Sequence, residues 1–307
     1  MNVMDAIPFA RANVPAAGEV VIDHLAHWVP DEPAASARLE ALGFTLAPFS
    51  HQVTRATPDA PPVSAGTANR CMMFRQGYIE ILTTTGDTPN AQTLKKGMAR
   101  YVGVHLIAFG SPDGDATADQ LRAAGFAPLP TVRLEREIGL QDGGTGHVRF
   151  NVVRLPPEAM PEGRIQFCHH RTPENMWQGR WLDHPNGATG LTSILVASPD
   201  PAETASRIGR FVGRAATRRA DGAMVLALDR GALVIVAGSA LPALTGAATP
   251  SLPYIAGYGV SVADIAATRA LAKDGRAVGD AHLVDAGPAV GGTIAFVPRA
   301  GAEPWLA

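Results

Sequence analysis

The sequence predicts an α+β fold made of four βαβββ modules, two in each half of the chain. The first observation is an internal repeat, because LEALGFTLAP (39–48) aligns with LRAAGFAPLP (121–130) at an offset of 82 residues. The second is that an apolar, strand-like run precedes each copy and further strand-like runs follow it. The third is a fainter version of the same plan in the second half of the chain. A recurring unit of this kind indicates a fold built by internal duplication.

The first module begins with the strand VVIDHLAHWV, followed by the loop VPDEP and a helix that ends at Gly43. The strands NRCMMF and YIEILTT complete it. A glycine just past a helix end suits a left-handed backbone conformation, and Gly125 recurs at the same place in the second module. That module opens with YVGVHLIAFG, continues through the loop SPDGD, and closes with TGHVRFNVVRL and RIQFCHH.

The second half of the chain supplies two further modules. GLTSILVASPDPAETASRIGRFVGR gives a strand, a loop and a helix, and VLALDRGALVIVAG gives a strand pair. YIAGYGVSVADIAATRALAKDGR begins the fourth module, which finishes with GGTIAFVPRA. The predicted division of the chain has four parts: a loosely held leader (1–17), an N-terminal domain (18–170), a connecting segment (171–190) and a C-terminal domain (191–307).

The composition favours a globular protein that binds small molecules. With 307 residues, of which 46% are hydrophobic and 18% charged, the chain can form a large core. A net charge of −2 without any Lys/Arg block argues against nucleic-acid or membrane partners. No apolar run approaches the roughly 20 residues of a membrane span, and the two cysteines fit reduced core thiols. We therefore expect a cytoplasmic protein with a small-molecule ligand, and a homodimer is compatible with the sequence.

Four polar residues of the first two modules are candidates for a metal site. His24 lies on the opening strand and Glu80 on the closing strand of the first module, and His105 and Gln166 hold the similar places in the second. Two modules packed about a pseudo-twofold axis would bring these four side chains together. Imidazole, carboxylate and amide oxygen are ligands for a divalent metal ion such as Fe, Mn, Zn, Ni or Mg. His27 points to the opposite face from His24 and is expected to be structural.

Three more residues are candidates for roles around this site. His170 shares the strand parity of Gln166, so that either His170 or Glu80 could move a proton in catalysis. Arg70, after GTAN, could bind an anionic group of a substrate, and a solvated arginine at a strand end fits equally well. Trp177 either covers the seam between the two halves or forms a wall of the substrate pocket.

This pattern resembles the vicinal oxygen chelate superfamily, and within it the glyoxalase-like domain proteins. The resemblance covers about residues 18–300 and rests on IDHLAHWVPD, LEALGF, GTANR, GYIEILT, HHRTPENMWQ and HPNGA. It implies four βαβββ modules paired into two cupped mixed β-sheet barrels with peripheral helices, as in the glyoxalase/bleomycin resistance/dihydroxybiphenyl dioxygenase fold. It also implies a metal ion that chelates two vicinal oxygens of a substrate.

The resemblance also bears on the reaction. His24, Glu80 and His105 fall where two-module enzymes of the superfamily place metal ligands, whereas Gln166 stands where a lyase or epimerase has a glutamate. An amide takes up no proton at neutral pH, which argues against lactoylglutathione lyase activity. Extradiol dioxygenases carry their ligands in the second half, where this chain has none at the corresponding positions. The pattern favours a metal-dependent lyase or isomerase acting on a small oxygenated metabolite, and leaves an Fe(II) ring-cleaving-type dioxygenase or a metal-free binding or sequestering protein as alternatives.

Overall fold

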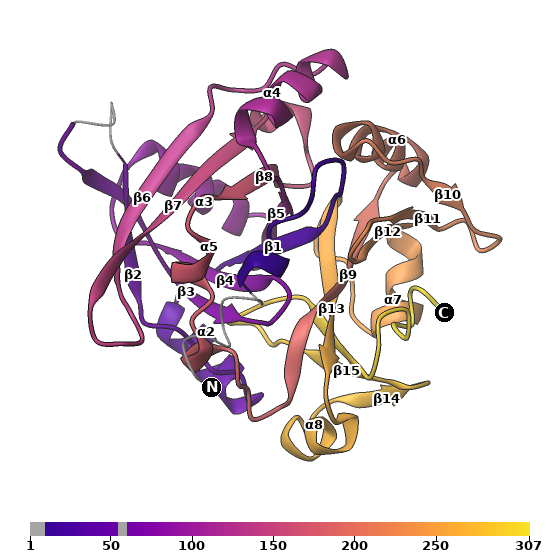
Figure 1. The fold of residues 1–307 in the computed structure, drawn as a ribbon. Coiled ribbons are helices and arrows are strands. Elements are labelled where there is room, and N and C mark those ends of the chain that lie inside the picture. Colours follow the sequence, from indigo (N-terminus) through magenta and orange to yellow (C-terminus); the bar gives the residue numbers. More distant parts are fainter. Residues whose placement is uncertain (1–9, 55–59) are drawn as a thin grey trace.

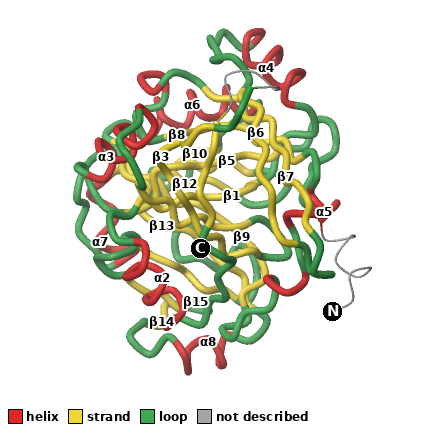
Figure 2. The backbone as a smooth tube through the Cα atoms, turned by 90° about the vertical axis from the view of Figure 1, so that its left-hand side faces the viewer, coloured by secondary structure: helices red, strands yellow, loops and turns green. Residues whose placement is uncertain are grey.

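Strands form the centre of the molecule and helices lie at its periphery (Figure 1), as the view turned by 90° also shows (Figure 2). The computed structural model describes residues 10–54 and 60–307, and within these ranges sixteen strands form one mixed sheet. Along the chain, the order strand, helix, three strands occurs four times. The predicted α+β fold of four βαβββ modules is therefore confirmed. No helix of the described ranges combines the length and the apolar character needed to cross a membrane.

Each module contributes four strands and one principal helix. The first module comprises β1 (Ile22–Trp28), α2 (Glu32–Ala41), β2 (Ser50–Thr54), β3 (Val63–Met73) and β4 (Tyr78–Thr84). The second comprises β5 (Gly103–Gly110), α4 (Gly114–Ala123), β6 (Val132–Gly139), β7 (Thr145–Arg154) and β8 (Arg164–His170). The third comprises β9 (Ala188–Ser198), α6 (Pro201–Val212), β10 (Thr217–Arg218), β11 (Met224–Ala227) and β12 (Ala232–Ala237). The fourth comprises β13 (Tyr254–Val262), α8 (Ile265–Leu271), β14 (Arg276–Val278), β15 (Ala281–Asp285) and β16 (Thr293–Val297).

Short elements lie between these principal ones. The α-helices among them are α3 (Pro89–Met98), α5 (Pro173–Met176) and α7 (Leu241–Thr245). The 3-10 helices are η1 (Pro157–Ala159), η2 (Gly179–Trp181) and η3 (Gly238–Ala240).

The sheet topology pairs the modules within each half. The opening strands β1 and β5 are antiparallel, and each pairs in parallel with the closing strand of its own module, β4 or β8. The N-terminal half therefore has the order β2-β3-β4-β1-β5-β8-β7-β6, and the C-terminal half repeats it as β10-β11-β12-β9-β13-β16-β15-β14. The outer strands β2 and β6 contact each other, so the N-terminal half closes into a cup. The two halves share the pairing of Ile255 on β13 with Val104 on β5.

Local capping residues mark the starts of all four module helices, and the first two helices end at the predicted glycines. An aspartate caps the N-terminus of each one by accepting hydrogen bonds from backbone N–H groups of the first turn. These aspartates are Asp31, Asp113, Asp200 and Asp264. Gly43 and Gly125 follow the first two helices with φ of 81°, in the left-handed region that favours glycine. Local sequence therefore sets the boundaries of these helices.

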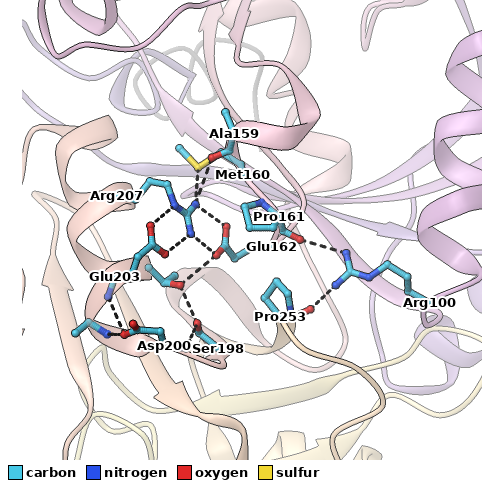
Figure 3. A network of polar contacts seen from close by, with 12 residues as sticks. Arg100, Ala159, Met160, Pro161, Glu162, Ser198, Asp200, Glu203, Arg207 and Pro253 are labelled. Atoms are coloured by element: carbon cyan, nitrogen blue, oxygen red, sulfur yellow. Dashed lines mark hydrogen bonds and ion pairs between the residues drawn. The ribbon is translucent and has the colours of Figure 1, made fainter.

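Polar contacts tie the two halves together (Figure 3). The carboxylate of Glu162, which is 1% exposed, accepts hydrogen bonds from Arg207 Nη2 at 2.8 Å and Nη1 at 3.0 Å, and from Thr204 Oγ1 at 3.2 Å. Glu162 precedes β8, whereas Arg207 and Thr204 belong to α6. Arg100 adds a second tie by donating to the backbone oxygen of Pro253 at 2.6 Å. These contacts fix α6 of the third module, and the segment that leads into β13 of the fourth, against the N-terminal half.

His27 forms a further tie from the middle of β1. Its Nδ1 lies 2.9 Å from the backbone oxygen of Val290, and its Nε2 lies 3.0 Å from the hydroxyl of Tyr258. A carbonyl oxygen only accepts, so Nδ1 carries the proton and Nε2 accepts from the hydroxyl. Burial lowers the pKa of His27 to about 4, because the charged ring is disfavoured away from water. The ring is therefore neutral and structural.

The predicted leader is only partly described. Residues 1–9 lie outside the described ranges, but Ala10 and Asn13 are buried. The Asn13 side chain donates to the backbone oxygen of Arg75 at 2.9 Å and accepts from the backbone N–H of Gly77 at 2.8 Å. The expectation of a loosely held leader is therefore wrong from residue 10 onward, because this stretch packs against the first module.

We expect the free energy of unfolding to fall as the pH is lowered from 6.5 to about 4. In this window the unfolded chain binds a proton at His27 and the folded chain does not, so acid favours unfolding. For His27 alone the loss is on the order of 3 kcal/mol. Denaturant titrations across this range measure it. The pH dependence should shrink in His27→Gln and stay unchanged in His51→Gln, an exposed position on β2, and an unchanged dependence in His27→Gln would contradict the assignment.

Candidate functional site

A pocket of about 210 Å³ opens inside the cup of the N-terminal half. Residues of β2 and β6 form facing walls, and β1, β4, β5 and β8 form its floor. A cavity of roughly 150 Å³ holds a benzene ring, so this pocket accommodates a somewhat larger small molecule. The imidazole, carboxylate and guanidinium groups that line it belong to His24, Glu80, Glu135, Arg136, Arg154 and Arg164. The amides that line it belong to Gln52, Asn69, Asn90 and Gln166.

The strand register arranges the floor of the pocket in two rows. The first row consists of Tyr78, His24, Ala108 and Gln166, on β4, β1, β5 and β8. The second row consists of Glu80, Ala26, Leu106 and Arg164, on the same four strands. Neighbouring strands are about 4.8 Å apart, so His24 and Glu80 are diagonal neighbours and Gln166 lies two strands from His24. The structure thus brings three of the four predicted ligands to one pocket.

His105 does not line this pocket, which corrects the predicted set of four. The pairs His24–Ala108 and Ala26–Leu106 map onto each other by an offset of 82, the same offset that relates the two helix ends. The counterpart of His24 is therefore Leu106. His105 lies one residue before this equivalent position. A shift of one residue along a strand changes the environment of the side chain.

His105 is a packing residue instead. Its ring stacks between Tyr101, with ring centroids 4.0 Å apart, and Trp28, at 4.9 Å. Its Nε2 donates to the backbone oxygen of Tyr101 at 2.9 Å. Burial lowers the pKa of His105 to about 4, so the ring is neutral.

Asp23 is the site residue that sequence reasoning missed. The β1–β5 register shifts between Ile22 and His24, so Asp23 is the extra residue of a β-bulge. Its carboxylate accepts from His24 Nδ1 at 2.5 Å and from His170 Nε2 at 3.0 Å. Strict alternation along the strand would have placed Asp23 and His24 on opposite faces. The available signal was a carboxylate in a buried apolar strand, the same signal that indicated Glu80.

Asp23 remains charged although it is fully buried. Burial raises the pKa of this carboxyl group, but the charges and hydrogen bonds of His170 and His24 outweigh burial and hold the pKa well below its usual range. The anion therefore places the proton of each imidazole on the nitrogen that faces it. In His24 that nitrogen is Nδ1, which leaves Nε2 to bind a ligand in the pocket.

Asp23 and His24 also belong to a group that could hold a metal ion. Within the described ranges, the ligand atoms of Asp23, His24, Cys168 and His170 lie within 4.8 Å of one another, and all four residues are buried. Cys168 Sγ is 3.8 Å from His170 Nε2. Burial raises the pKa of the Cys168 thiol well above its ordinary value, so the thiol is protonated. Of the predicted metal ligands, this group contains only His24.

Glu80 and Gln166 are structural counterparts, in agreement with the repeat. Ala26 on β1 pairs with Glu80, and Ala108 on β5 pairs with Gln166. The Glu80 side chain is half-buried, and one of its carboxylate oxygens accepts from Asn69 Nδ2 at 2.8 Å. The pocket therefore has a carboxylate on one side of its floor and a neutral amide on the other.

Three arginines line the pocket, and none of them was a candidate from the sequence. Arg164 donates from Nη2 to Asn90 Oδ1 at 3.1 Å, and its guanidinium lies 5.4 Å from the centroid of the Trp28 ring. Burial and the nearby charge of Arg154 lower the pKa of Arg164 to about 10. The Nε of Arg154 is buried without a hydrogen-bond partner in the part of the chain that the structure describes. Arg136 completes the set.

Arg70 and Trp177, predicted as substrate contacts, do not line the pocket. Arg70 lies 3.8 Å from Glu32 and 3.7 Å from Glu40, both on α2, so its charge is met by carboxylates outside the pocket. Trp177 is fully buried and donates from Nε1 to the backbone oxygen of Phe74 at 3.0 Å. Both predictions are corrected by long-range contacts that the local sequence does not reveal.

The C-terminal half has neither an imidazole nor a carboxylate at the strand positions equivalent to His24 and Glu80. Ser193 and Gly257 take the place of His24, and Val234 and Ala295 take the place of Glu80. Trp305, 1% exposed, packs in the same apolar cluster as Val234 and Ala295 and donates from Nε1 to Ser193 Oγ at 2.9 Å. Residues near the C-terminal end of the chain therefore fill the second cup.

We expect Leu106→His and His105→Leu to have opposite consequences. Leu106→His should raise the affinity for Zn²⁺, because it places a second imidazole beside His24 in the pocket. His105→Leu should leave Zn²⁺ affinity unchanged and lower the free energy of unfolding by about 1–3 kcal/mol through lost stacking and a lost hydrogen bond. Isothermal titration calorimetry and denaturant titration measure the two effects. The assignment of Leu106 as the counterpart of His24 would be refuted if Zn²⁺ affinity fell in His105→Leu and did not change in Leu106→His.

Comparison with known protein families gives one match. A family model described as a glyoxalase-like domain matches residues 22–212, which span the first two modules and the beginning of the third. No curated protein matches the chain.

Two solved structures share the fold of this chain at low sequence identity, and a third is less similar. A hypothetical protein from Staphylococcus aureus is 12% identical, with a TM-score of 0.62 over 91% of this chain and 100% of its own. A xylose isomerase-like TIM barrel/4-hydroxyphenylpyruvate dioxygenase fusion protein is 14% identical, with a TM-score of 0.52 over 84% of this chain and 39% of its own. A variant of 4-hydroxymandelate synthase from Streptomyces coelicolor is 14% identical, with a TM-score of 0.48 over 83% of this chain and 75% of its own.

Proposed function

The chain belongs to the glyoxalase-like domain family of the vicinal oxygen chelate superfamily, and we propose that it is a divalent-metal-dependent lyase or isomerase acting on a small oxygenated metabolite. One observation carries the proposal. Asp23 engages Nδ1 of His24, and the remaining ring nitrogen serves a pocket that Glu80 and Gln166 also line. A histidine whose second nitrogen is held by a carboxylate is the usual arrangement of a metal ligand.

The donors on the pocket floor fit a divalent metal ion. His24 offers an imidazole nitrogen, Glu80 a carboxylate and Gln166 an amide oxygen. This mixed set suits Zn, Mn, Fe or Ni, and only its oxygen ligands suit Mg. Leu106 occupies the place of a fourth ligand. Three protein donors leave coordination positions for substrate oxygens.

Hydrogen bonds to Asp23 hold His24 in place beneath the pocket floor. They belong to the buried group of Asp23, His24, Cys168 and His170. The two ring nitrogens lie 2.5–3.1 Å from the Asp23 oxygens, which are hydrogen-bond distances. Both oxygens of Asp23 are therefore engaged by N–H groups. We assign the metal to the pocket side of His24 for this reason.

The residues of this chain would orient the substrate and move its protons. A bound divalent ion supplies Lewis-acid polarisation of a carbonyl, enol or diol oxygen. Glu80 is the pocket group that can accept and return a proton next to this oxygen, because Gln166 is an amide. His170, predicted as an alternative proton carrier, does not line the pocket and bonds to Asp23, so it acts as a positioning residue for His24. Leu82 and Phe150 form apolar parts of the wall.

A metal-free binding or sequestering protein is the second candidate. Leu106 and Gln166 favour this candidate. A metal site with a histidine and a carboxylate from each module would have an imidazole in place of Leu106 and a carboxylate in place of Gln166. This candidate predicts that ligands raise the melting temperature equally with and without a chelator. An Fe(II) dioxygenase would use the same three donors. Adding different metal ions to the metal-free protein, and measuring which of them restores turnover, distinguishes a dioxygenase from a lyase or isomerase.

We expect the purified protein to bind about one divalent ion per chain, measured by elemental analysis and calorimetry. His24→Ala and Glu80→Gln should each remove a ligand and weaken binding strongly. Asp23→Asn should weaken it by roughly 10–100-fold, because Asp23 only orients His24. The matched control is Glu135→Gln, since Glu135 lines the same pocket but is paired with Arg149 at 2.9 Å.

Two results would count against this assignment. Absence of stoichiometric metal, with ligand binding unaffected by a chelator, would favour the metal-free candidate. Metal binding that is lost in Cys168→Ser and retained in Glu80→Gln would move the ion to the buried group behind His24.

A further inference from the structure

The pocket of the N-terminal half carries more positive than negative charge, although the whole chain has a net charge of −2. Three arginines and two glutamates line it. Glu135 already pairs with Arg149, and Glu80 accepts from Asn69. Within residues 10–54 and 60–307, none of the three pocket arginines has a carboxylate within 4.0 Å. Among the residues that the structure describes, direct ion pairs therefore do not balance this excess positive charge.

Arg154 and Arg164 concentrate this charge at one end of the pocket. Arg154 on β7 pairs directly with Gln166 on β8, and Arg164 lies two residues before Gln166. Cross-strand partners and alternate residues of one strand share a face, so the three side chains point to the same side, and all of them line the pocket. Asn90 and the Trp28 ring hold Arg164 in place.

This arrangement is unfavourable unless an anion completes it. Two neighbouring cations in a partly buried site repel each other, and burial removes their hydration. The Nε of Arg154 is buried and has no acceptor among the described residues. Guanidinium groups bind carboxylate and phosphate through paired, charge-assisted hydrogen bonds, which would supply the missing acceptors.

We propose that Arg154 and Arg164 form a subsite for a carboxylate or phosphate group, so that the substrate is a small organic acid or phosphate ester. The oxyanion binds at the Gln166 end of the pocket, and the oxygen-bearing carbon of the substrate extends toward His24 and Glu80. The orientation rests on the proposed function, because it places the reacting oxygen beside the proposed metal ligands. The subsite itself needs no metal ion.

The experiment measures anion binding in the presence of a chelator and at constant ionic strength. The probes are pyruvate, succinate, benzoate and inorganic phosphate at millimolar concentration, with methyl pyruvate as a neutral analogue of pyruvate. Calorimetry and thermal unfolding should show binding of at least one anion and none of the neutral ester. Binding by carboxylates or by phosphate identifies which oxyanion the subsite takes.

Variants connect binding to the two arginines. Arg154→Met and Arg164→Met should each weaken anion binding by tenfold or more, consistent with the loss of charge-assisted hydrogen bonds, and Arg154→Lys should retain part of it. The matched control is Arg133→Met, because Arg133 is exposed on β6, pairs with Asp115 at 3.2 Å and does not line the pocket. Without a ligand, Arg154→Met should be at least as stable as the wild type, since it removes an unpaired buried charge.

Two outcomes would overturn the subsite. The first is that no anion of the panel binds the wild type. The second is that binding persists unchanged in Arg154→Met. Anion binding that depends on Arg154 supports the subsite even if no metal binds at Glu80, and loss of anion binding with an intact metal site overturns the subsite alone.

Discussion

The buried Asp23 carboxylate is the interaction on which the pocket depends. An anion without access to water is stable only when donors surround it, and here the donors are imidazoles from two different modules. His24 comes from the opening strand of the first module and His170 from the closing strand of the second. The carboxylate therefore joins the two modules beneath the pocket floor and orients the ring nitrogen that faces the ligand. A β-bulge makes this geometry available at the cost of one unpaired residue.

The same bulge occurs at the corresponding position of all four opening strands, but only in the first is it followed by a histidine. The bulge residues are Asp23, His105, Thr192 and Ala256, and the pocket-facing residues that follow them are His24, Leu106, Ser193 and Gly257. Duplication thus kept the backbone and changed the chemistry. The first module supplies the imidazole of His24 and the carboxylate of Glu80, and the second supplies the amide of Gln166, the carboxylate of Glu135 and all three arginines. Because the two modules carry different side chains at equivalent positions, the expectation of the same ligands in both modules does not identify the full set of pocket residues.

Sequence reasoning succeeded where local signals decide the structure and failed where register or distant contacts decide it. The repeat and the helix-end glycines Gly43 and Gly125 predicted the modules, and Glu80 followed from the cost of a carboxylate in an apolar strand. His105 was misplaced because a bulge moves one residue out of alternation, and a sequence does not show where a bulge lies. Arg70 was chosen for its neighbours in the chain, whereas its charge is met by α2. The arginines of the second module gave no local signal at all.

Trp305 fills the interior of the C-terminal half, whereas the corresponding interior of the N-terminal half contains the pocket. In the C-terminal half, this ring and the buried Glu303 carboxylate, which accepts from Ser193 Oγ at 2.9 Å, complete the interior. In the N-terminal half the equivalent volume stays hollow, and the side chains around it lack packing partners on one side. The filled C-terminal half is therefore expected to be the more rigid one. In the N-terminal half, the side chains around the pocket keep the local mobility that entry of a small molecule requires. The filled cup of the C-terminal half thus serves as a packed support for the hollow cup of the N-terminal half.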